Sequence, residues 1–273
     1  MEVSTVCLGT SLKSGSDFFY AFRRVEKSKL QLINQFHELI REWDKYIRTS
    51  QNESVIQTKF SWWKKEIERF ANHQSQHPLT KRLQNNCELS IIIRAEYLEE
   101  ILDSFLMILP RNTTTVDTPL LFHQKLGGHM FTIISELLGI SGHSELLEAN
   151  TQGILCQRTH FIRYYGYWIN NILPISLENC QKFGISSNVL YNPHSQKNTW
   201  LEFIHQEIDD ILKKQDVLER QRKRRNPNYE PNPINIIGNI SRLFLKKIDK
   251  NPMVILDSPV TISPIRALLA ALL

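Results

Sequence analysis

Residues 29–48, with the sequence KLQLINQFHELIREWDKYIR, decide the fold class of this 273-residue chain. Apolar side chains recur in this stretch at spacings of three and four residues: Ile33, Phe36, Ile40, Trp43 and Ile47. That spacing places them on one face of an α-helix, and polar residues fill the opposite face. The pattern therefore predicts an amphipathic helix that buries one side against other helices.

The same periodicity extends outward along the chain. Ser16 or Asp17 is placed to cap a shorter helix that runs to Phe22. A proline disfavours a helical residue before it, so we expect a helix break at His77-Pro78. Further helices are predicted over residues 55–72, 79–88, 91–109, 120–138, 144–171, 200–225 and 234–250.

Between these helices, polar and turn-forming residues predict loops at 112–117 and 188–198. Three prolines between residues 226 and 233 exclude a helix there, and a short extended tail is expected before the apolar ending at 265–273. The predicted organisation has four parts, of which the last packs on the same domain: an N-terminal extension (1–15), an all-α domain (16–225), a Pro-rich connector (226–233), and a C-terminal helix and tail (234–273).

The amino-acid composition supports a globular, helical protein. Hydrophobic residues make up 41% of the chain and charged residues 22%, which excludes a wholly disordered chain, and 10 glycines and 11 prolines are too few for a many-stranded sandwich. The net charge of +5 permits an anionic partner without requiring one. The basic run at 213–225 has only Tyr229 as an aromatic neighbour, so we predict no nucleic-acid partner.

Four cysteines lie far apart, without a paired motif: Cys7, Cys87, Cys156 and Cys180. With no secretory leader and no apolar run of membrane-spanning length, they predict reduced thiols and a cytoplasmic protein.

His73 with His77, and Cys156 with His160, have a spacing of four that two metal ligands could share. Solvated or capping histidines are favoured for the first pair, because no companion carboxylate or cysteine lies nearby, and a packed thiol beside a hydrogen-bonded histidine is favoured for the second.

Several segments, in their order along the chain, resemble the squalene/phytoene synthase family. They are SDFFYAFR (16–23), IREWDKYIR (40–48), WWKKEI (62–67) followed by His77-Pro78-Leu79, and Leu177-Glu178 followed by KFGIS (182–186). The resemblance implies a single helical bundle of the isoprenoid synthase type around a central apolar cavity. It also implies prenyl diphosphate substrates and Mg²⁺ held by two aspartate-rich motifs on facing helices, since carboxylates at i and i+4 can share a metal.

The chain departs from both motifs. In the first, Asp44 remains, but Lys45 and Arg48 stand where the family has aspartates. In the second, residues 149–177 contain no Asp or Glu, and the family's acidic run is replaced by Asn170-Asn171 on a segment made positive by Arg158, His160 and Arg163. We therefore expect no cofactor, with Mg²⁺ bound only if activity is retained and Asp44 as its weak candidate ligand.

The resemblance also suggests binding residues. Arg23, Arg41 and Arg163 are candidate contacts to an anionic group, and surface or capping ion pairs are an equal alternative for them. Six aromatic residues are candidates to line a former prenyl cavity, although simple core packing is favoured for them. They are Phe18, Phe19, Phe22, Phe36, Phe122 and Tyr164.

Three functions follow, and the sequence leaves open whether the protein is an enzyme. The favoured one is a catalytically degenerate relative that binds a partner protein, or an isoprenoid without turnover. Its RYYG (163–166) and ILP (172–174) segments are similar to the family branch of a mitochondrial complex I assembly factor. The second is an active prenyltransferase that condenses prenyl diphosphates. The third is a helical interaction module whose 265–273 tail docks to a partner or a membrane surface, with packing of that tail into a groove of the domain as the favoured alternative.

Overall fold

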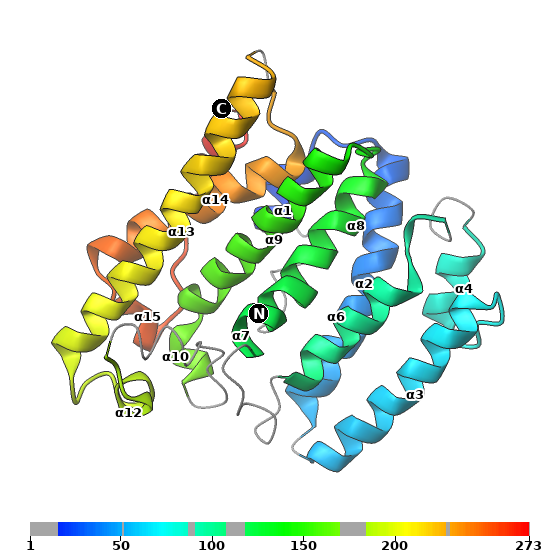
Figure 1. Ribbon diagram of the computed structural model, residues 1–273, viewed down its shortest axis with the longest axis horizontal. Coiled ribbons are helices and arrows are strands. Elements are labelled where there is room, and N and C mark those ends of the chain that lie inside the picture. Colours follow the sequence, from blue (N-terminus) through cyan, green and yellow to red (C-terminus); the bar gives the residue numbers. More distant parts are fainter. Residues whose placement is uncertain are drawn as a thin grey trace.

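The computed structural model describes residues 16–50, 52–86, 91–107, 118–169, 184–227 and 230–272. All regular structure in these ranges is helical, and they contain no strand, which confirms the all-α prediction. Figure 1 shows the helix of residues 143–163 running through the middle of the bundle, with other helices on both sides. The candidate site is built around this central helix.

The N-terminal part contributes α1 (Asp17–Phe22), α2 (Lys27–Thr49), α3 (Glu53–Ala71) and α4 (Pro78–Gln84). Local capping defines their starts. The Ser16 hydroxyl accepts from the Phe19 backbone N–H at 3.0 Å, and His77 Nδ1 accepts from the Leu79 N–H at 3.2 Å, just before Pro78 opens α4. The predicted cap of the first helix, the break at His77-Pro78 and the capping role of His77 are confirmed.

The middle of the chain contributes α6 (Ala95–Met107), α7 (Thr118–His123), the π-helical turn η2 (Gln124–Gly128), α8 (His129–Leu137), α9 (His143–Arg163) and α10 (Tyr165–Trp168). The helix predicted over 120–138 is confirmed as a continuous helical segment, with the π-helical turn η2 within it as the unpredicted feature. At that point η2 packs on α9 backbone to backbone: a Cβ atom added to Gly153 would lie 2.1 Å from the Gly127 carbonyl oxygen. This close approach requires glycine.

The C-terminal part contributes α12 (Ser187–Tyr191), α13 (Lys197–Arg225), α14 (Pro233–Lys250), α15 (Val254–Asp257) and α16 (Pro264–Ala270). Two predictions were wrong here. The loop expected at 188–198 begins with α12, whose Leu190 carbonyl accepts from the buried Tyr165 hydroxyl at 2.8 Å. The extended tail after α14 contains α15, which buries Ile255 and packs its backbone against Gly166. Both short helices are stabilised by contacts to α10, which local sequence does not reveal.

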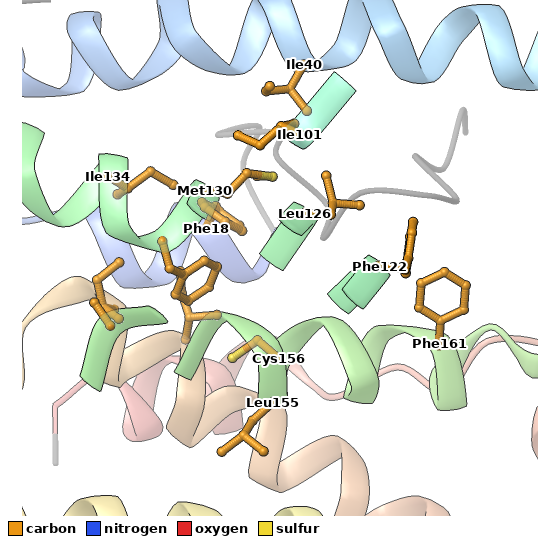
Figure 2. Close-up of a cluster of buried hydrophobic side chains, with 14 of the residues drawn as sticks. Phe18, Ile40, Ile101, Phe122, Leu126, Met130, Ile134, Leu155, Cys156 and Phe161 are labelled. Atoms are coloured by element: carbon orange, nitrogen blue, oxygen red, sulfur yellow. The ribbon is translucent and has the colours of Figure 1, made fainter. Parts of the chain in front are cut away.

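One contiguous hydrophobic core joins these helices. On one side, Trp43 of α2 packs edge to face on Trp63 of α3 and Phe105 of α6, with ring centroids 5.7 and 6.4 Å apart. Nearer the middle, side chains from α1, α2, α6, η2, α8 and α9 converge, including Phe18, Ile40 and Phe161 (Figure 2). No helix in the described ranges is both long enough and apolar enough to cross a membrane.

Candidate functional site

The wall formed by α2 carries Asp44, the residue that the sequence predicts to remain from the first motif. Asp44 is completely buried, one helical turn beyond Ile40, which points into the central cluster of Figure 2. His37 lies seven residues before Asp44, hence on the same helix face, and it is also completely buried. Its ring stands edge-on to Phe18 of α1, with centroids 5.1 Å apart. The inner face of α2 therefore places one carboxylate and one imidazole among apolar side chains.

The wall formed by α9 carries an amide and an imidazole where the family's second motif is expected. Gln157 and His160 are both buried on this helix. Phe161 packs edge to face on Phe122 at 5.2 Å (Figure 2). The ring of His123 lies 5.3 Å from that of Phe161. This wall offers aromatic rings, an amide and imidazoles to the interior.

His123 is an uncharged group in this setting. Burial, with a smaller contribution from nearby Arg158 and His160, lowers the pKa of its imidazole to about 3. Its Nδ1 atom is buried and has no hydrogen-bond partner within the part of the chain that the structure describes. A neutral imidazole with an unused polar atom can accept or donate one hydrogen bond to a neutral polar group.

The arginines of α9 are engaged inside the protein. Arg158 donates to Glu207 and Asp210 of α13, each at 2.8 Å. Arg163 donates through Nη1 to Asp17 at 3.0 Å and through Nε to the Val260 carbonyl at 2.6 Å. Its guanidinium also lies over the ring of Phe244, 3.8 Å from the centroid. Both side chains therefore join α9 to neighbouring elements.

Arg23 and Arg41 differ from Arg163. Both are half-buried, Arg23 just after α1 and Arg41 on α2 three residues before Asp44. Neither forms an ion pair with another of the described residues. They remain candidate contacts to an anionic group.

The candidate cavity residues fall into two groups. Phe18, Phe22, Phe36 and Phe122 are at most 1% exposed and belong to the core, with Phe18 and Phe22 stacked at 5.4 Å. Phe19 and Tyr164 are half-buried; Tyr164 lies against the His160 ring at 4.6 Å. A packed core and the lining of a prenyl cavity would both bury these aromatic residues in this way, so both interpretations of them stay open.

Glu66 is a buried residue that sequence reasoning passed over. Its carboxylate accepts from Thr80 Oγ1 at 2.5 Å, from the backbone N–H groups of Gln76 and His77 at 2.7 and 2.8 Å, and from Arg69 at 2.9 Å. These donors outweigh the cost of burial and lower the pKa of the carboxyl group. The segments that contain Glu66 and His77-Pro78 resemble the family, and in the structure this carboxylate fixes the turn between α3 and α4.

The thiol of Cys156 is free and buried on α9, as the packed interpretation predicts. Its sulfur accepts from Gln152 Nε2 at 3.5 Å and from Ser241 Oγ at 3.4 Å. Burial raises the pKa of the thiol to about 11, so it stays protonated. The other three cysteines lie outside the described residues.

The donor groups do not match the magnesium ion that the resemblance implies. Mg²⁺ requires a near-octahedral set of oxygen ligands, usually including carboxylates. Among the described residues, Asp44 and Glu66 are the buried carboxylates, and Glu66 is already occupied by its four donors. Those residues also contain no cluster of three or more His, Cys, Asp or Glu able to hold a metal. Asn170, Asn171 and the side chain of Arg48 lie outside the described part.

Comparison with known proteins gives one match. The family model described as squalene/phytoene synthase matches residues 12–266, which is nearly the whole chain. No individual curated protein matches it.

Proposed function

This chain belongs to the squalene/phytoene synthase family, and we propose that it uses the family's helical interior to bind an isoprenoid without turnover. In this proposal the metal-dependent ionisation of a prenyl diphosphate is lost, while the apolar interior that accommodates a prenyl chain is kept. The observation that carries it concerns the buried carboxylates: among the described residues these are Asp44 and the hydrogen-bonded Glu66, and no cluster there could hold a metal.

The charge balance of the interior supports the loss of ionisation. Departure of a diphosphate requires its negative charge to be neutralised, and the family does this with metal ions bound by aspartates. Lys45 and Arg48 replace two of those aspartates, and cations beside Asp44 repel a divalent ion. Arg158 and Arg163, which could neutralise a phosphate, are instead bound to Glu207, Asp210 and Asp17.

The apolar side of the interior supports isoprenoid binding. The central cluster is built from large aliphatic and aromatic side chains drawn from many different helices (Figure 2). Such surfaces bind prenyl chains through burial of apolar area. Arg23 and Arg41 are the half-buried guanidiniums that this proposal assigns to an anionic head group.

The experiment is native mass spectrometry of the purified protein with farnesyl and geranylgeranyl diphosphate, with and without Mg²⁺. We expect one bound prenyl molecule per chain and the same occupancy in both conditions. Arg41→Gln combined with Arg23→Gln is expected to lower the occupancy, whereas Arg24→Gln, at the exposed neighbouring position, leaves it unchanged. Binding that requires Mg²⁺, or no binding at all, contradicts the proposal.

A further inference from the structure

The C-terminal helix α16 and the turn after it present their large apolar side chains to solvent. Ile265, Leu269 and Leu272 are 70%, 52% and 52% exposed, whereas Ala267 and Ala270 face the core. Ile265 and Leu269 lie four residues apart on one face of α16, and Leu272 follows in the turn after the helix; these three side chains are called here the α16 stripe. Globular proteins bury large apolar residues in preference to small ones, and a contiguous exposed apolar stripe marks an interaction site.

The α16 stripe is carried by a segment that packs against the rest of the protein. α16 packs against α14 and α1 through its buried alanines. Its start is set by Ser263, whose hydroxyl accepts from the Arg266 backbone N–H, and by Pro264 at the first helical position. The three large side chains are therefore held outward by a folded helix.

Basic residues accompany the α16 stripe. Arg266 lies on α16 itself and is exposed. The last turn of α14, a helix that packs against α16, exposes Lys246, Lys247 and Lys250. Lys247 Nζ donates to the Thr261 carbonyl at 2.8 Å, which ties this basic turn to the segment leading into α16. The one acid in that turn, Asp249, is paired with His205 at 2.6 Å.

We propose that the α16 stripe inserts into the surface of a membrane that contains anionic lipid. Aliphatic side chains on one face of a helix, with cations beside them, bind at the boundary between head groups and acyl chains. Three side chains are far fewer than the roughly 20 residues per partner that a stable protein interface uses. This inference goes beyond the proposed function: it concerns the outer surface, and it holds or fails independently of what the interior binds.

The experiment is vesicle flotation of the full chain with phosphatidylcholine vesicles and with vesicles that also contain phosphatidylglycerol. We expect flotation with the anionic vesicles, reduced by added salt, and little flotation with phosphatidylcholine alone. Replacing the stripe (Ile265→Ser, Leu269→Ser and Leu272→Ser together) is expected to lower partitioning at least tenfold. The matched control replaces three exposed aliphatic residues elsewhere, Ile91→Ser, Leu120→Ser and Leu147→Ser, and is expected to float like the wild type.

A second variant tests the charges. Lys246→Glu with Lys250→Glu is expected to weaken binding to anionic vesicles by more than tenfold, since each basic residue near such a surface contributes about fivefold. Thermal melting checks that every variant folds. The proposal is overturned if the wild type does not float, if the stripe variant floats equally well, or if the stripe instead holds two copies together. In that last case, the wild type sediments as a dimer and the stripe variant as a monomer.

Discussion

Arg163, the last residue of α9, and Asp17, the first residue of α1, form an ion pair at 3.0 Å although 146 positions separate them in sequence. The same guanidinium donates to the Val260 carbonyl near the C-terminal helix. One side chain from the segment that carries the second acidic motif in the family thus joins the beginning and the end of the bundle. The positive charge of Arg163 therefore helps to hold the fold together, and its removal should change the free energy of unfolding.

Arg163→Ala is expected to lower the free energy of unfolding by about 2–3 kcal/mol, because it removes charged hydrogen bonds in a largely buried place. Asp17→Asn is expected to cost less than about 1 kcal/mol. Burial raises the pKa of the Asp17 carboxyl group more than Arg163 lowers it, so losing its charge relieves a desolvation cost. Urea denaturation of both variants measures the difference. Equal losses for the two would contradict this account of the pair.

Glu66→Gln is expected to destabilise the protein by about 2–4 kcal/mol, because an amide cannot accept from all four donors that surround the carboxylate. The exposed Glu68→Gln is the matched control, with an expected effect below about 0.5 kcal/mol. The folded pKa of Glu66 lies below its ordinary value of 4.5, so its contribution is present above pH 4.5 and is lost as the pH falls through the folded pKa. A wild-type and variant difference that does not shrink in acid would show that the charge is unimportant.

His123→Phe is expected to remove a different acid sensitivity. The imidazole has a pKa of about 3 in the folded protein against an ordinary 6.5, so protons bind preferentially to the unfolded chain. Wild-type stability should therefore fall as the pH drops below 6.5, and the His123→Phe variant should lose less stability over the same range. Chemical denaturation at about pH 7.5 and about pH 5 measures this, with the exposed His143→Gln as control. An identical pH dependence in wild type and His123→Phe would contradict it.

Gly153→Ala tests the contact between η2 and α9. The added methyl group would meet the Gly127 carbonyl oxygen at 2.1 Å, and backbone cannot move aside as a flexible side chain can. We expect a loss of more than about 3 kcal/mol. Gly184→Ala, where the space around the Cβ position is open and the cost comes from a φ of +63°, is expected to cost only about 1 kcal/mol. Thermal melting ranks the two, and a larger loss for Gly184→Ala would contradict the packing argument.

Features that depend on neighbouring residues in the chain were predictable from sequence. The helix of residues 29–48 appears as α2, and the cap at Ser16 and the break at Pro78 lie where expected, since periodicity, side-chain caps and proline act locally. The π turn at 124–128 and the helices α12 and α15 were not predictable in this way. Each depends on an element distant in sequence: Gly153 for the π turn, and α10 for the two short helices.

The same distinction applies to the candidate site. The sequence shows Asp44 together with Lys45 and Arg48 at positions where the resemblance implies aspartates, but the burial of Asp44 was not predicted. The engagement of Arg163 by Asp17 was not, because it depends on how the two ends of the bundle meet. Glu66 was overlooked because a carboxylate followed by a His-Pro turn does not by itself indicate burial.

The most direct test of the central claim is the release of pyrophosphate from farnesyl and geranylgeranyl diphosphate by the wild-type protein in the presence of Mg²⁺. An active member of the family in the same assay is the control. We predict release at the rate of the protein-free reaction, because Asp44 and Glu66 are the buried carboxylates among the described residues and no cluster there could hold a metal. Mg²⁺-dependent release at a rate comparable to the active enzyme, abolished by Asp44→Asn, would contradict the account.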